Sequence, residues 1–294
     1  MSNMISAEFP FNSKFIDING SKMHYVDEGK GDPVLFLHGN PTSTYLWRNI
    51  IPHLSNSARC IAPDLIGMGK SDKPNIQYKF VDHYHYLNTF IEKLGLKNVT
   101  LVIHDWGSAL GFHYAFEHQE NIKGIAFMEG IYMPAKWSAL PKVMKRGFKM
   151  MRTPFLGWFM ISVRNIFIKK LLPSSIIRKL TTKELNTYAK PYPSISSRKP
   201  LRVWPTEIPF DGTPKNMHQI VNSYHNWLKE TQLPKLLLYA KPGLLIRKKD
   251  VLWIQNNFPN IKTISVGKGL HYIQEDNPDM IGSELAKWYL TIVE

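Results

Sequence analysis

The chain has 294 residues, 44% of them hydrophobic, and a formal net charge of +14, enough for one large domain with a substantial core. Its single cysteine excludes an intramolecular disulfide and a cysteine-rich metal site. The sequence contains no run of about 18 uncharged apolar residues, so we expect no membrane span. The N-terminal stretch lacks the pattern of a signal peptide, so we expect a cytoplasmic protein.

Short apolar runs recur along the chain and predict the strands of a sheet. The first two form a hairpin with Asn19 and Gly20 in its turn. The next six lack polar alternation, which is typical of buried parallel strands: 34–38, 59–64, 99–104, 123–129, 235–240 and 261–266. Between them, apolar residues spaced three to four apart from Phe80 to Leu94 predict a helix that ends near Gly95. This alternation predicts an α/β fold with a doubly wound, mostly parallel sheet.

Residues 131–215 interrupt the alternation and predict a helical cap inserted after the sixth strand. The core would then comprise residues 1–130 and 216–294. Residues 135–200 contain fifteen lysines and arginines but one acid, Glu184, while the rest of the chain has 22 basic and 22 acidic residues. The entire net charge therefore lies in the predicted cap.

An apolar stretch within this segment, residues 154–172, is flanked by basic residues. One interpretation is a basic amphipathic helix that contacts an anionic membrane or another polyanion. The interpretation we favour is a helix that buries its apolar face over the active site and exposes its basic face. The chain has no nucleic-acid-binding motif, so we expect no nucleic-acid partner.

The stretch VIHDWGSALGF, residues 102–112, is typical of a strand-to-helix elbow that carries a nucleophile at its tip. The candidates are Asp105 and Ser108. A strained elbow requires small neighbours, and Gly107 lies two residues after Asp105, whereas Trp106 and Leu110 flank Ser108. The apolar strand ends at the residue before Asp105. The pattern therefore favours Asp105, with Ser108 as the alternative.

Further polar residues follow other predicted strands. Gly39 and Asn40 follow the run 34–38, Glu129 ends the run 123–129, and His271 lies in a loop after the last run. Reactive groups in an open parallel sheet gather outside the carboxyl ends of its strands. The chain order of nucleophile, acid and histidine matches a hydrolase triad.

Four segments together resemble the haloalkane dehalogenases of the α/β-hydrolase fold: 34–54, 60–74, 101–115 and 269–289. The resemblance implies that Asp105 is the nucleophile, His271 the general base and Glu129 the acid that orients it. It also implies that Asn40 and Trp106 bind the halide. In other branches of this family the acid follows the next strand, which makes Asp250 the competing candidate.

The resemblance further implies a substrate pocket under the cap, lined by Leu140, Phe148, Phe167, Leu245 and Tyr272. The expected substrates are a small halogenated aliphatic compound and water, the products are an alcohol, a halide ion and a proton, and no cofactor or metal is expected. The oligomeric state depends on surfaces that these motifs do not describe.

The expected chemistry requires a carboxylate nucleophile. A carboxylate attacks an sp³ carbon without losing a proton and forms an ester that water can hydrolyse, whereas a serine would form a stable ether. Epoxide hydrolases share the aspartate and the following tryptophan, but usually have a bulky apolar residue where Asn40 stands. Coelenterazine-using luciferases share all of these motifs. A binding protein that has lost activity is a further alternative, although every catalytic position is filled.

Overall fold

The computed structural model describes residues 5–293. Met1 to Met4, part of the stretch searched for a signal peptide, and Glu294 lie outside the described residues. Within residues 5–293, eight strands form one sheet in the order β1-β2-β4-β3-β5-β6-β7-β8. The strands are β1 (Lys14–Ile18), β2 (Ser21–Glu28), β3 (Pro33–Leu37), β4 (Arg59–Pro63), β5 (Val99–Asp105), β6 (Ile122–Gly130), β7 (Lys235–Pro242) and β8 (Ile261–Gly269). The pairs from β4 to β8 are parallel, and β1 and β2 extend the sheet as antiparallel strands. The predicted fold class is confirmed.

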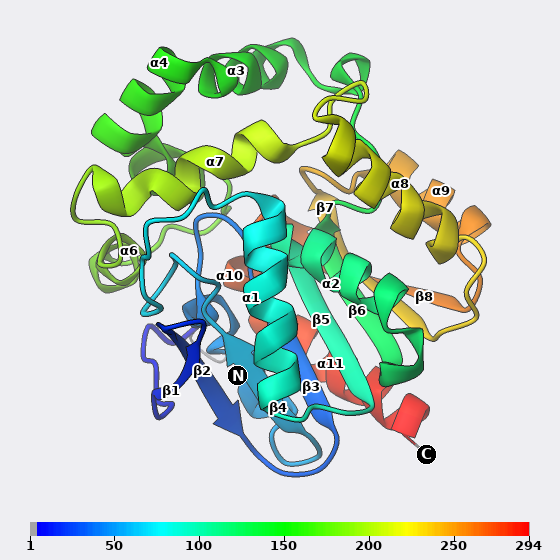
Figure 1. Ribbon diagram of the computed structural model, residues 1–294. Coiled ribbons are helices and arrows are strands. Elements are labelled where there is room, and N and C mark those ends of the chain that lie inside the picture. Colours follow the sequence, from blue (N-terminus) through cyan, green and yellow to red (C-terminus); the bar gives the residue numbers. More distant parts are fainter. Residues whose placement is uncertain (1–4, 294) are drawn as a thin grey trace.

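Helices cover both faces of this sheet (Figure 1). The α-helices are α1 (Phe80–Lys93), α2 (Trp106–Glu117), α3 (Lys142–Arg152), α4 (Pro154–Gly157), α5 (Leu172–Ser174), α6 (Thr182–Ala189), α7 (Lys199–Glu207), α8 (Lys215–Leu228), α9 (Lys248–Asn257), α10 (Ile273–Asp276) and α11 (Pro278–Val293). Short 3₁₀ turns are η1 (Thr44–Trp47), η2 (Ile51–His53), η3 (Gln119–Asn121), η4 (Trp137–Ala139) and η7 (Ser196–Arg198). Two π-helical turns are η5 (Trp158–Val163) and η6 (Phe167–Leu171). Among the described helices, none is long and apolar enough to cross a bilayer.

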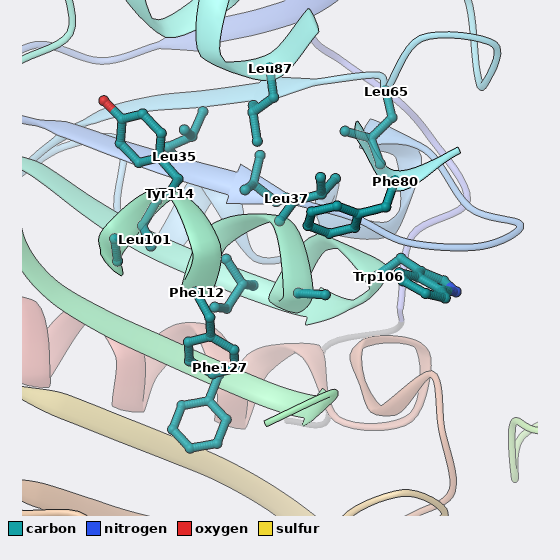
Figure 2. Packing of buried hydrophobic residues seen from close by; sticks show 14 of the residues in the cluster. Leu35, Leu37, Leu65, Phe80, Leu87, Leu101, Trp106, Phe112, Tyr114 and Phe127 are labelled. Atoms are coloured by element: carbon teal, nitrogen blue, oxygen red, sulfur yellow. The ribbon is translucent and has the colours of Figure 1, made fainter. Parts of the chain in front are cut away.

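Two apolar clusters lie on opposite faces of the sheet, because successive strand residues point to opposite sides. On β5, Leu101 and Ile103 belong to the cluster beneath α1, α2 and α8, while Val102 belongs to the cluster beneath α11. Figure 2 shows Phe112 of α2 beside Phe127 of β6, with ring centroids 5.3 Å apart. Both faces are apolar, so these strands lack the alternation of half-exposed ones. The two packed layers hold the strand ends, and therefore the candidate site, in fixed positions.

The segment 131–215 contributes no strand to the eight-stranded sheet of the described chain. It arches over one end of the sheet as the green to yellow-green part of Figure 1, with α3, α4, α6 and α7 (called the cap below). The next helix, α8, packs on α2 beside the sheet instead.

The expected single helix over 154–172 is wrong. The stretch forms α4, then η5, and restarts as η6 after Asn165, whose φ of +51° interrupts the helical path. Asparagine adopts this left-handed conformation more readily than most residues. The apolar residues are divided accordingly: Ile161, Ile168 and Leu172 are buried, whereas Phe155 is exposed.

Candidate active site

Asp105 lies at the junction where β5 ends and α2 begins. Its φ of +49° and ψ of −126° are unusual for a residue with a side chain and store strain, typically of order 1–3 kcal/mol. The backbone N–H of Asn40 donates to Asp105 Oδ2 at 2.7 Å, and the N–H of Trp106 also bonds the carboxylate. The carboxylate is therefore held by two backbone donors.

Two glycines allow this close approach. A Cβ on Gly39 would lie 2.2 Å from Asp105 Oδ2, and one on Gly107 would lie 2.2 Å from the carbonyl oxygen of Leu37. Real Cβ contacts are never that short, so a side chain at either position would push α2 away from β3. An elbow centred on Asp105 therefore needs its small neighbours, as the sequence predicts.

Ser108 occupies the first turn of α2 and is fully buried. Its hydroxyl donates to the carbonyl of Asp105 at 2.5 Å and accepts from the N–H of Ile131 at 2.7 Å. Ser108 therefore links the elbow to the end of β6 through hydrogen bonds, in addition to filling space as a small residue. The hydroxyl group uses both its proton and a lone pair in bonds to the backbone, which disfavours Ser108 as a nucleophile.

His271 lies between the two carboxylates that the sequence singled out. Its Nε2 is 3.4 Å from Asp105 Oδ1, and its Nδ1 is 3.4 Å from Glu129 Oε2. Glu129 stands at the end of β6 with a φ of +43°. Its carboxylate accepts backbone N–H groups from residues 244–246 of the loop after β7, the shortest from Leu245 at 2.7 Å. The glutamate is therefore fixed independently of the histidine.

The electrostatics of the three groups are coupled. Burial disfavours a charge on Asp105, but a hydrogen bond and the charge of His271 outweigh it and lower the pKa of the carboxyl. Burial likewise acts to lower the pKa of His271, and hydrogen bonds to Asp105 and Glu129 overcome it and raise that pKa to about 9. At neutral pH the resting site therefore contains an ionised Asp105 beside a protonated histidine.

The two predicted halide-binding residues flank Asp105. Asn40 Nδ2 donates one proton to the carbonyl of Leu201 in α7 at 3.3 Å, and its second proton has no acceptor among residues 5–293. Trp106 stacks on Trp204 of α7, with ring centroids 4.5 Å apart and planes 26° apart. Figure 2 shows the Trp106 ring pointing away from the packed side chains of the sheet. Cap residues thus orient both side chains.

The predicted pocket residues lie in different environments. Tyr272 is buried, and its hydroxyl donates to the carbonyl of Asn40 at 2.9 Å. Leu245 is half-buried in the loop that holds Glu129. Phe148 in α3 and Phe167 in η6 are half-buried and pack against the main apolar cluster, and Leu140 follows η4. Their contact with a substrate stays a prediction.

Asp250, the competing acid, lies at the beginning of α9. Its Oδ2 accepts the N–H of Arg247 at 2.9 Å, and its Oδ1 accepts the Tyr132 hydroxyl at 3.4 Å. This is a helix-capping role, and the structure pairs His271 with Glu129 instead.

Sequence reasoning missed several residues that hold the site. His104 is buried, and burial lowers its pKa to about 3, so its neutral ring donates through Nε2 to the carbonyl of His271 at 2.9 Å. Ser175 in the cap accepts the N–H of His271 at 3.1 Å. The position of His104 directly before Asp105 was a usable signal, whereas Ser175 gave none.

Comparison with known proteins agrees with this geometry. Residues 32–278 match the family model described as alpha/beta hydrolase fold, which defines the chain as an α/β hydrolase. A haloalkane dehalogenase from Sphingobium indicum is 44% identical over 94% of this chain and 95% of its own length. One from Mesorhizobium japonicum is 42% identical over 95% of this chain and 91% of its own length. The chain belongs to the haloalkane dehalogenase family.

Solved structures support the same conclusion. The haloalkane dehalogenase DbeA from Bradyrhizobium elkani superposes with a TM-score of 0.94 at 38% identity, over 96% of this chain and 99% of that one. DatA from Agrobacterium tumefaciens superposes with a TM-score of 0.91 at 33% identity, over 96% of this chain and 97% of its own.

Proposed function

We propose that this chain hydrolyses a carbon–halogen bond of a haloalkane to an alcohol, a halide ion and a proton, through an ester on Asp105. The main support for the proposal is that the two carboxylate oxygens of Asp105 have different partners. Oδ2 accepts the N–H of Asn40 at 2.7 Å, while Oδ1 faces His271 Nε2 at 3.4 Å. Oδ1 is therefore the attacking atom, and Oδ2 becomes the carbonyl oxygen of the ester.

In the first step Asp105 Oδ1 forms a bond to the halogen-bearing carbon as the carbon–halogen bond breaks. The lowered pKa of Asp105 keeps the nucleophile ionised. The departing halide takes hydrogen bonds from Asn40 Nδ2 and the Trp106 indole, which are neutral donors and so stabilise the anion without trapping it. The carbonyl of Leu201 and the ring of Trp204 hold these donors in place.

In the second step water attacks the ester carbonyl. Esterification removes the negative charge of Asp105, one of the two carboxylates that raise the pKa of His271. That pKa consequently falls, the ring releases its resting proton to solvent, and the neutral imidazole takes a proton from the attacking water. The Cγ–Oδ1 bond of Asp105 then breaks, and the alcohol leaves with Oδ1 and this proton. The new carboxyl group of Asp105 ionises and protonates His271 again. The backbone N–H groups of Asn40 and Trp106 already bond the carboxylate and stabilise the charge that develops on Oδ2.

The direct test measures halide release from a panel of chloroalkanes and bromoalkanes by the wild type and Asp105→Ala. We expect release by the wild type and none above background by the variant. Diol formed from an epoxide, or light from coelenterazine, without halide release would assign the site to one of the related families instead.

We also propose that residues 131–215 form a cap domain and that the remainder of the chain forms a core domain. We propose that the protein is cytoplasmic.

We further propose that the basic surface of the cap makes weak contact with anionic lipid. In α3, Val143 is 83% exposed among basic residues, and Phe155 in α4 is 76% exposed. Exposed apolar side chains beside lysines and arginines suit the interface of a negatively charged membrane. The exposed aromatic ring favours a membrane over another polyanion.

This contact is tested by flotation with vesicles of phosphatidylcholine, with and without phosphatidylserine, at physiological salt. We expect a bound fraction only with phosphatidylserine, which is reduced by Phe155→Ser and by Arg146→Glu while halide release stays unchanged. Absence of binding to the anionic vesicles, or equal binding to both, would contradict the proposal.

A further inference from the structure

A buried cluster of four charged side chains lies where the cap meets the loop that carries His271. The side chains of Arg48, Glu184 and Glu275 are each 1% exposed or less, and that of Arg178 is 22% exposed. The two positive and two negative charges balance. Glu184 is the one acid within the strongly basic segment 135–200, and the structure places it in this cluster.

The four groups come from three separate parts of the chain. Arg48 directly follows η1, in the segment that begins at Asn40. Glu275 lies in α10, four residues after His271. Arg178 and Glu184 belong to the cap, the latter in the first turn of α6. The cluster therefore joins both loops of the active site to the cap.

The contacts converge on Glu275. Arg48 grips it with two parallel bonds, Nη1 to Oε1 at 2.6 Å and Nη2 to Oε2 at 2.9 Å. Arg178 donates to the same carboxylate, and its Nε donates to the Glu275 carbonyl at 2.5 Å. The Tyr188 hydroxyl is a further donor. Glu184 bridges the two arginines, at 2.8 Å from Arg48 and 2.5 Å from Arg178.

Backbone contacts attach the same cap segment to the residues on either side of Glu275. The N–H groups of His271 and Tyr272 donate to the carbonyl of Ser175 at 3.1 and 3.3 Å. The N–H of Arg178 donates to Asp276 at 2.9 Å. The loop from residue 271 to 276 is consequently held against the cap along its length.

Stability alone is a weak reason for such a cluster, because a buried ion pair can often be replaced by apolar side chains without loss. Paired charges with fork-like bonds do, however, fix geometry tightly. His271 needs such precision only when its Nε2 must activate water. Asp105 is held by other contacts, the N–H groups of Asn40 and Trp106, and its attack on carbon requires no proton transfer by His271.

We propose that the buried cluster of Arg48, Arg178, Glu184 and Glu275 positions His271 from the cap, and so sets the rate of ester hydrolysis but not of ester formation. The four residues are positioning residues that act through His271. This inference rests on the proposed ester mechanism.

The test is Glu275→Gln, studied by rapid quench with a short 1-bromoalkane and by intact-mass measurement of the enzyme. The amide nitrogen would face the donors of Arg48 and break the fork. We expect the first equivalent of bromide at within about threefold of the wild-type rate. Hydrolysis should slow between about tenfold and a hundredfold, so that alkylated enzyme accumulates, in line with the cost of a displaced catalytic group.

The matched control is Asp27→Asn. Asp27 on β2 receives a similar fork from Arg59, at 2.8 and 3.0 Å, far along the sheet order from β8. This variant loses a forked ion pair of similar geometry but greater exposure, and it should retain both wild-type rates. Equal slowing of both steps in a folded Glu275→Gln, or no change in either, would overturn the proposal.

If Glu275→Gln does not fold, Arg178→Met decides the question, because Arg178 is partly exposed and its replacement removes the direct link from the cap to the Glu275 carboxylate. We expect the same selective slowing of hydrolysis, and unchanged hydrolysis would overturn the proposal. A wild type that forms no ester at all would refute the ester mechanism itself, which separates the two failures.

Discussion

The strand ends and the cap hold the active site by different means. Asp105 and Glu129 are fixed by their own strands, by positive φ angles and by backbone N–H groups. The cap holds its share through long side chains that pair across the chain, such as Arg178 with Glu275. The contacts at the strand ends use backbone N–H donors, whereas the cap contributes charged side chains, and both kinds of contact join residues distant in the chain. The residues proposed for the chemistry lie in short sequence motifs, whereas the contacts that position them are spread over the fold.

Among changes at the strand ends, we expect Glu129→Gln to have the largest effect on activity. The amide would carry no charge and would present its NH₂ group to the N–H donors of residues 244–246. We expect kcat to fall by about 10²–10⁴-fold, the range for losing an oriented general base. Steady-state halide release measures this.

The control for that prediction is Asp250→Asn. The amide oxygen of asparagine can still accept the N–H of Arg247, so α9 should persist and kcat should remain near that of the wild type. Loss of activity in Asp250→Asn together with retention in Glu129→Gln would reverse the assignment of the acid.

Gly39→Ala tests the close backbone approach to Asp105, the proposed nucleophile. The added Cβ would lie 2.2 Å from Asp105 Oδ2 and 2.6 Å from the nitrogen of Trp106, so the N–H donors at this carboxylate must move. A displacement of about 1 Å costs about 100-fold in rate, and we expect kcat/KM to fall by that order. Gly147→Ala in α3 is the control, because its Cβ would meet nothing within 4 Å. Equal activity of both variants would contradict the elbow geometry.

Ser108→Ala should have a smaller effect. It leaves the partly buried N–H of Ile131 without its acceptor, which costs about 1–3 kcal/mol in the free energy of unfolding. We expect kcat to change less than tenfold, because the hydroxyl takes no part in the chemistry. Denaturant unfolding and halide release measure the two quantities, and complete inactivation of a folded variant would revive Ser108 as the nucleophile.

The smallest effect concerns pH and stability. His271 binds its proton more tightly in the folded chain, where its pKa is about 9, than in the unfolded chain, where the ordinary value of 6.5 applies. Its contribution is fully present below pH 6.5 and is lost as the pH rises through about 9. The stability advantage of the wild type over His271→Gln should shrink across this interval in denaturant unfolding. A constant difference would show that the histidine is not stabilised by its carboxylates.

The residues at the strand ends could be predicted from the sequence, whereas most contacts of the cap could not. The strands, the elbow and the order of Asp105, Glu129 and His271 are local patterns, and the fold confirms the strands. The break at Asn165 escaped prediction because a single left-handed residue overrides an apolar run. The pairing of Glu184 with Arg48 was beyond reach, since it depends on where the cap closes. The solitary acid in a basic segment was nevertheless a visible sign of it.

The proposed ester on Asp105, which His271 resolves, is tested most directly by mixing His271→Ala with a short 1-bromoalkane and measuring the intact mass and then the peptide map. We expect one equivalent of released bromide, one alkyl group per chain on Asp105, and no further turnover. Sustained turnover by this variant, or an alkyl group on any other residue, would contradict it.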